Sequence, residues 1–150
     1  MTRQRQYLDI RDSLLKQALD RGEAVQVSFS GTSMEPYFHT GDTLVLASAD
    51  RPVKAGEVVA YRRHDKLITH VVHGQVKWRG RCWYLCKGAA NRLGDYPVAR
   101  ESLLGVVTHV RRDGRLMACV PVRTSWTSMV TWRHLVVKSL YQRLVQGAGL

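Results

Sequence analysis

The sequence has no long hydrophobic run. No stretch approaches the roughly 18 consecutive apolar residues that a membrane-spanning helix requires. The N-terminal stretch, Met-Thr-Arg-Gln-Arg-Gln, leads into alternating charges and lacks the apolar centre of a secretory signal peptide. These absences predict a cytoplasmic protein without a membrane anchor, either free or bound at a membrane surface.

Cysteine is scarce, with only Cys82, Cys86 and Cys119 in the chain, and their spacing does not fit a metal site. Cys82 and Cys86 are four residues apart in a predicted strand, so both side chains should face the same side. We interpret all three as reduced thiols in a reducing compartment, with a disulfide or a metal site as the minor alternative. No metal or other cofactor is expected.

Acidic residues are also few, and none follows Asp113. The 150-residue chain carries 23 Lys and Arg against 12 Asp and Glu, which gives a formal charge of +11. This excess favours an anionic partner such as nucleic acid, an anionic membrane surface or an acidic peptide. It could also serve solubility alone, because the basic residues are spread widely. The length suits one domain that buries its own core.

Short apolar segments at close intervals indicate a mainly β fold. The periodicity predicts strands at residues 24–29, 43–48, 57–62, 67–72, 75–78, 82–87, 103–112 and 115–120. Asp113-Gly114 is typical of the tight turn of a hairpin between the last two strands. The pattern predicts an all-β sandwich or barrel in residues 24–122.

Helical periodicity occurs at both ends of the chain. In the N-terminal segment, residues 1–23, apolar residues recur at helical spacing at Tyr7, Ile10, Leu14, Leu15 and Ala18. We expect this amphipathic helix to pack on the β domain. The C-terminal segment, residues 123–150, predicts a basic amphipathic helix with tryptophans. That helix could lie on an anionic membrane, or its apolar face could cover the core or a partner.

A serine lies in a tight turn at residues 30–36, which read Ser-Gly-Thr-Ser-Met-Glu-Pro. Gly31 can adopt backbone angles that other residues avoid, and Pro36 fixes one dihedral. Such a turn can hold the Ser33 hydroxyl at a set angle beside backbone N–H groups, as acyl transfer requires. The segment alone fits equally well with a turn that ends a strand and holds an incidental serine.

Two later segments contain groups that could activate this serine. His70 lies in the strand pattern 67–72, and an imidazole can accept a proton near neutral pH. On position alone, a half-buried structural histidine is the favoured interpretation. Asp95, in the polar loop 87–98, could orient an imidazole or could bond its own backbone. His39 and His73 are weaker candidate bases.

In combination, these three segments resemble the type I signal peptidase family. The order and spacing fit over residues 25–110, including the turns at Gly41-Asp42 and Gly56-Glu57. The resemblance is to the branch of the endoplasmic reticulum, archaea and spore-forming bacteria, which uses histidine where the common bacterial branch uses lysine. It implies a coiled, partly open β-barrel and a serine endopeptidase that cleaves a leader or signal-like peptide.

The resemblance also implies residue roles. Ser33 would be the nucleophile, His70 the general base and Asp95 the residue that orients it. The Ser33 N–H would be one oxyanion donor, and the hydroxyl of Thr32 or Ser30 could supply another. Met34 would either pack beneath the nucleophile or form a wall of the substrate pocket. The implied substrate is an extended peptide that pairs with a strand edge and has small residues beside the cleaved bond.

The sequence departs from the family pattern at two positions. Ala89 and Val71 stand where the family often has aspartate and arginine. If Asp95 did not reach the imidazole, the site would be a serine–histidine dyad. A lysine dyad is less favoured, because neither Lys66 nor Lys87 occupies the position of the histidine.

The family is typically membrane-anchored, so the missing anchor favours a cytoplasmic peptide or small protein as substrate. The alternative is an inactive peptide-binding or membrane-associated relative. Nucleic acid is the least favoured partner. Related self-cleaving repressors carry a separate DNA-binding domain, which residues 1–24 are too few to form.

Overall fold

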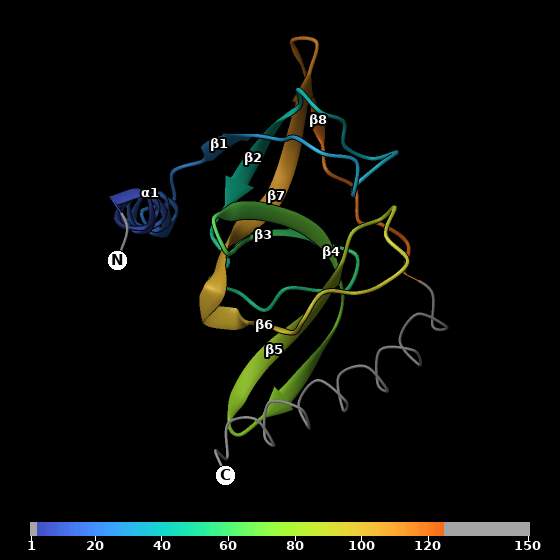
Figure 1. The fold of residues 1–150 in the computed structure, drawn as a ribbon. Coiled ribbons are helices and arrows are strands. Elements are labelled where there is room, and N and C mark those ends of the chain that lie inside the picture. The colour runs from blue at the N-terminus through green and yellow to red at the C-terminus, as the bar shows by residue number, and fades with distance from the viewer. Residues whose placement is uncertain (1–2, 125–150) are drawn as a thin grey trace.

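The computed structural model describes residues 3–124, and all structural statements below refer to these residues (Figure 1). The predicted C-terminal helix lies outside them, apart from residues 123 and 124. The elements in chain order are α1 (Arg3–Asp20), β1 (Val25–Ser28), β2 (Thr43–Ala47), β3 (Val58–Arg63), β4 (Lys66–Trp78), β5 (Arg81–Lys87), β6 (Val98–Ala99), the 3-10 helix η1 (Arg100–Ser102), β7 (Leu103–Arg112) and β8 (Arg115–Ala118).

The described strands form one open antiparallel sheet, in the order β1-β2-β7-β3-β4-β5-β6, with β8 also paired to β7. The predicted mainly β class is therefore confirmed. Residues 67–72 and 75–78 were predicted as two strands but belong to the single strand β4. The register against β5 shifts between Val72, which pairs with Cys86, and Gly74, which pairs with Leu85, so His73 is the extra residue of a β-bulge and the strand continues through the glycine.

The β7–β8 hairpin turns at Asp113 and Gly114, which both have positive φ angles, 48° and 74°. This is the pattern expected of a tight hairpin turn, and the predicted hairpin is confirmed. The two-residue strand β6 was not predicted, because a segment of that length has no measurable periodicity.

The core consists of two hydrophobic clusters, and β3 contributes to both. Val58 and Ala60 lie in one cluster, whereas Val59 and Tyr61 lie in the other. All four are buried, because successive side chains of a strand point to opposite faces and both faces of the sheet are covered here. Tyr61 is thereby directed to the same face as Val59, whose register partner on β4 is His70.

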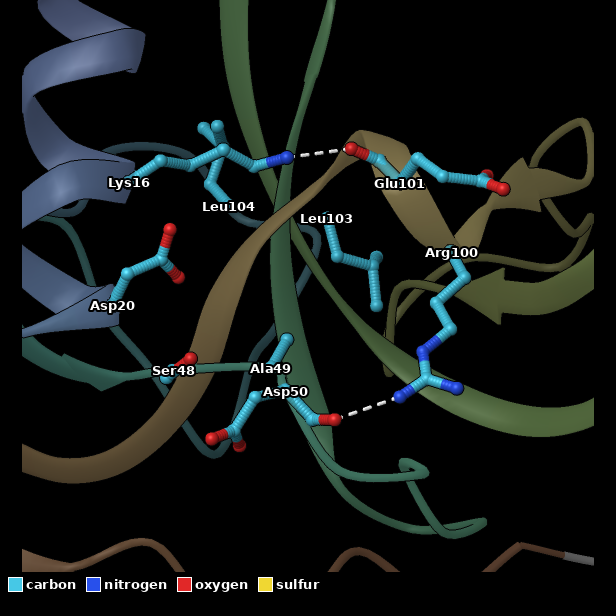
Figure 2. Close-up of a pocket in the computed structure, with 9 residues that line it drawn as sticks. All are labelled: Lys16, Asp20, Ser48, Ala49, Asp50, Arg100, Glu101, Leu103 and Leu104. Atoms are coloured by element: carbon cyan, nitrogen blue, oxygen red, sulfur yellow. Dashed lines mark hydrogen bonds between the residues drawn. The ribbon is translucent and has the colours of Figure 1, made fainter. Parts of the chain in front are cut away.

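Helix α1 is attached to the sheet near the start of β7. Leu19 is 1% exposed, and Gly105 leaves room for it, since a Cβ at that glycine would lie 3.0 Å from Leu19 Cδ1. Figure 2 shows Lys16 reaching across to donate to the backbone oxygen of Glu101, at 2.6 Å. Lys16 and Glu101 border a hollow of about 250 Å³ between α1 and the end of β2.

The face of α1 that packs differs from the predicted apolar stripe. Tyr7, Ile10 and Leu14 are 67%, 55% and 59% exposed, whereas Leu15 of the same predicted stripe packs against the core. The helix instead turns Asp12 toward the sheet, where it accepts a hydrogen bond of 2.7 Å from Arg62 Nη2. An ion pair of partly buried groups thus fixes a rotation of the helix that apolar periodicity alone does not indicate.

A buried ion pair closes the turn that follows the serine segment. Asp42 is 2% exposed and accepts hydrogen bonds from Arg112 Nε and Nη2, at 2.8 and 2.6 Å. It also accepts one from the His39 N–H, at 2.8 Å. The Arg112 hydrogen bonds, together with the smaller contribution of His39, lower the pKa of Asp42 although burial opposes the shift. The pair ties the turn to the end of β7.

Replacing Asp42 with asparagine is expected to lower the free energy of unfolding at pH 7 by about 2 kcal/mol, because the buried Asp42 side chain loses charge-assisted hydrogen bonds from Arg112 and the hydrogen bond from the His39 N–H. The folded-state pKa of Asp42 lies below its unfolded value, so the carboxylate stabilises the fold fully above about pH 4. That contribution is lost as the pH falls through the lowered pKa. Urea unfolding at several pH values should therefore show the difference between variant and wild type shrinking below about pH 4.

Asp113→Asn is the matched control, since it makes the same change at an exposed turn beside Arg112. It should alter stability by no more than about 0.5 kcal/mol. Equal stability of Asp42→Asn and wild type at pH 7 would contradict the assigned role of the ion pair.

Candidate active site

Hydrogen bonds on both sides of Ser33 fix the turn that contains it. Gly31 has a φ of 116°, and its N–H donates to Thr40 Oγ1 at 3.0 Å. Residues with a Cβ rarely adopt this φ, which explains the glycine. On the other side, the Ala90 N–H donates to the Ser33 backbone oxygen at 2.9 Å. Met34 is fully buried in the core beneath the turn.

The structure brings Ser33, His70 and Asp95 into one hydrogen-bonded chain. Ser33 Oγ lies 3.1 Å from His70 Nε2, and His70 Nδ1 is hydrogen-bonded to Asp95 Oδ2. The three residues come from the turn after β1, from β4 and from the loop between β5 and β6. His70 is 5% exposed, so the imidazole is shielded while Ser33 remains half-buried at the surface.

The environment keeps Asp95 ionised. Burial acts to raise its pKa, but hydrogen bonds from His70 and Tyr61 and the positive charge of Arg63 outweigh burial, and the net effect lowers the pKa. The Arg63 Nη1 lies 3.6 Å from Asp95 Oδ1. An ionised carboxylate beside Nδ1 favours a proton on that nitrogen and leaves Nε2 free to accept the serine proton.

Tyr61 and Arg63 contact Asp95, and both were missed from the sequence. Tyr61 Oη is hydrogen-bonded to Asp95 Oδ2 and lies 3.3 Å from His70 Nδ1. In the sequence it belongs to an apolar strand pattern, where a buried tyrosine indicates core packing. The register of the β3–β4 hairpin could have identified it, because Tyr61 shares a face with Val59, the direct partner of His70.

The predicted oxyanion and binding residues lie around the serine in different environments. Ser30 is exposed and borders the groove described below. Thr32 is also exposed, and its backbone oxygen accepts a 3.1 Å hydrogen bond from the Glu35 N–H within the turn. The burial of Met34 agrees with packing beneath the nucleophile rather than with forming a pocket wall.

The weaker candidate bases lie elsewhere. His73 is 7% exposed and borders a separate hollow together with Lys87; burial, with the Lys87 charge, lowers its pKa. His39 is exposed and contributes its backbone N–H to Asp42. Lys87 donates to the Asn91 backbone oxygen at 3.0 Å.

A groove of about 510 Å³ runs beside Ser33. Residues 28–31 and Ser33 border one side, and residues 66–70 border the other. In the described part of the chain, β1 pairs only with β2, and β5 joins β4 only from Val71 onward. The edge of β1 that faces away from β2, and the edge of residues 66–70 of β4 that faces away from β3, therefore present backbone groups without a neighbouring strand.

Gly88 sets the spacing between the serine turn and the loop that holds Asp95. A Cβ at this position would lie 2.6 Å from the Ser33 backbone oxygen and 2.7 Å from Asn91 Nδ2. Gly88→Ala is therefore expected to push the turn away and to lower kcat by about 10-fold to 100-fold in a peptide-cleavage assay.

Gly105→Ala provides the matched control for the Gly88 variant. Its Cβ would lie 2.8 Å from the Ala47 backbone oxygen, a similar clash that involves β2 and α1 rather than the serine turn. Both variants should lower the melting temperature, but only Gly88→Ala should lower the kcat of the folded fraction. Unchanged kcat in Gly88→Ala would show that the contact does not position the serine.

Residues 3–124 contain no group of three or more His, Cys, Asp or Glu side chains that could hold a metal ion. The three cysteines in this range are free thiols, with Cys86 buried. Within the same range, no helix combines the length and hydropathy needed to cross a membrane.

Comparison with known proteins gives a partial match. No family model matches the chain. The signal peptidase complex catalytic subunit SEC11C of Homo sapiens, Mus musculus and Canis lupus familiaris is in each case 35% identical to it over 81 residues, which are 51% of this chain and 42% of the relative. The chain thus spans less than half the length of these curated relatives. The similarity supports a relationship to signal peptidase catalytic subunits.

Proposed function

We propose that this protein is a serine endopeptidase of the signal peptidase type that uses histidine as its base and removes a leader or signal-like segment. The observation that carries the proposal is the continuous contact from Ser33 Oγ to His70 Nε2 and from His70 Nδ1 to Asp95. Nucleophile, base and orienting acid in hydrogen-bond reach are the geometry that serine acyl transfer requires. The similarity to SEC11C supports the same reading.

In the proposed reaction, Ser33 Oγ attacks the substrate carbonyl while His70 Nε2 accepts the hydroxyl proton. The tetrahedral oxyanion is stabilised by the Ser33 N–H and by a hydroxyl from Thr32 or Ser30. Collapse of this intermediate breaks the peptide bond as the imidazolium protonates the leaving amine. Water, activated by the same imidazole, then releases the acyl group.

The groove beside Ser33 supports an extended peptide as the substrate. A strand placed between the outer edge of β1 and residues 66–70 could form main-chain hydrogen bonds on both sides. Side chains of the peptide would then alternate between groove and solvent, which leaves selection to shallow pockets and favours small residues beside the cleaved bond.

The proposal also includes three features expected from the sequence. They are a coiled, partly open barrel, a basic C-terminal helix that contacts an anionic membrane surface, and a cytoplasmic location. The formal charge of +11 supports an anionic surface or an acidic leader as the partner. Nucleic acid is not proposed as a partner.

A peptide library tests this function. Wild-type protein, with and without anionic lipid vesicles, is incubated with peptides of random sequence, and the products are identified by mass spectrometry. We expect cleavage after small residues, and loss of cleavage when proline replaces a residue that pairs in the groove, because proline lacks the N–H. Binding of peptides without any cleavage would favour the inactive relative and would overturn the proposal.

A further inference from the structure

We propose that Tyr61 is a positioning residue, which holds Asp95 and selects the tautomer of His70 that can act as a base. This inference rests on the proposed function and adds a fourth member to the Ser33, His70 and Asp95 chain. The family motifs that point to those three residues do not include this tyrosine.

The geometry places one hydroxyl against both partners of the catalytic pair. Tyr61 Oη is hydrogen-bonded to Asp95 Oδ2, the same oxygen that His70 Nδ1 contacts, and it lies 3.3 Å from Nδ1 itself. The tyrosine and imidazole rings meet edge to face, with centroids 6.3 Å apart. Tyr61 is 1% exposed, so the strand and the core fix the hydroxyl in this position.

The number of available protons assigns the tautomer. Burial, followed by the nearby Cys86 and Asp95, raises the pKa of Tyr61, so its hydroxyl keeps its one proton at neutral pH. The carboxylate oxygen can only accept, and that proton therefore goes to Asp95. The tyrosine oxygen then presents only lone pairs to Nδ1. A hydrogen on Nδ1 meets two acceptors, whereas a bare Nδ1 would face two oxygens and no donor. Nε2 is left unprotonated toward Ser33.

The other charged and titratable groups near the pair strengthen this arrangement. Arg63, two residues along β3, approaches Asp95 Oδ1 at 3.6 Å, so the two carboxylate oxygens have different partners from the same strand. Arg63 Nη2 also donates to the Tyr96 backbone oxygen, at 3.1 Å, and this hydrogen bond fixes the loop between β5 and β6 that contains Asp95. Cys86 is fully buried, and burial raises the pKa of its thiol, so it adds no charge at neutral pH.

Tyr61 does not border the groove beside Ser33. Removing its hydroxyl should consequently leave substrate binding unchanged and affect the proton transfer. Without this hydroxyl, Asp95 Oδ2 loses the contact with Tyr61 that holds it against Nδ1, so a larger share of the imidazole carries its proton on Nε2 and cannot accept the serine proton. A carboxylate that is held less well also stabilises the imidazolium less, so the acid limb of the pH–rate profile should move to lower pH.

The test compares Tyr61→Phe with Tyr84→Phe, which removes another fully buried hydroxyl that bonds the Val53 N–H at 3.1 Å, away from the pair. We expect Tyr61→Phe to lower kcat by roughly 10-fold to 100-fold with KM unchanged and the acid limb moved to lower pH. Tyr84→Phe should keep the wild-type kcat and pH profile. Wild-type kcat and pH profile in folded Tyr61→Phe would overturn the inference.

A second measurement does not depend on activity. Nitrogen-15 NMR of histidine-labelled wild-type protein reports which ring nitrogen of His70 carries the proton, with His70→Gln used to assign the signal. A protonated Nδ1 at neutral pH, with a larger fraction of the other tautomer in Tyr61→Phe than in Tyr84→Phe, supports the inference. Predominant protonation of Nε2 in the wild type overturns it. If no peptide is cleaved but Nδ1 is protonated as expected, the proposed function fails and the positioning role of Tyr61 stands.

Discussion

Replacing Ser33 with alanine is expected to lower kcat/KM for any cleaved peptide by at least about 10⁴-fold. The Ser33 hydroxyl forms the acyl intermediate in the proposed mechanism, and its Oγ lies 3.1 Å from His70 Nε2. The backbone of the turn is held by Ala90 and the buried Met34, so the variant should fold and bind peptide as the wild type does. Steady-state kinetics and isothermal titration with the same peptide measure both quantities.

Ser48→Ala is the matched control for this loss. Ser48 is half-buried like Ser33, but it borders the hollow between α1 and the end of β2 (Figure 2). It should keep wild-type activity. Cleavage by Ser33→Ala at more than about one tenth of the wild-type rate would reject the serine as the nucleophile.

The second large effect is expected from Asp95→Asn. An asparagine amide could donate to Nδ1 and would then stabilise the tautomer with the proton on Nε2, which cannot accept the serine proton. We expect kcat to fall by about 10³-fold to 10⁴-fold with little change in KM. The variant also decides between a triad and a dyad, since a serine–histidine dyad would lose about 10-fold or less.

Asp65→Asn is the control for the loss of one negative charge. Asp65 is exposed in the turn between β3 and β4, and the kinetic constants of this variant should match the wild type. A decrease in kcat of less than about 10-fold in Asp95→Asn would leave the histidine without an essential orienting acid and would contradict the triad.

The strand pattern and the serine turn could be predicted from the sequence, for physical reasons. Strands bury alternate residues, so their periodicity is local and readable, as at residues 43–48 and 103–112. The serine turn is also local, since Gly31 requires a positive φ. The resemblance to a known family, rather than local pattern, predicted that His70 and Asp95 would come together.

Features that depend on contacts between distant segments could not be read from the sequence. The rotation of α1 depends on Asp12 meeting Arg62, fifty positions away. The role of Tyr61 requires the β3–β4 register and the fold of the loop that contains Asp95. The sequence predicts a break at Gly74, between the strands at residues 67–72 and 75–78. Pairing of β4 with β5 on both sides of the bulge outweighs the low strand propensity of this glycine.

The most direct test of the central claim is to trap the acyl intermediate. The protein is mixed with an activated ester of a short peptide ending in a small residue, quenched in acid, digested and analysed by mass spectrometry. The account predicts one acyl group per chain on Ser33 in the wild type, with the adduct greatly reduced in His70→Ala and retained in His73→Ala. An adduct on another residue, or equal labelling of Ser33 in wild type and His70→Ala, would contradict it.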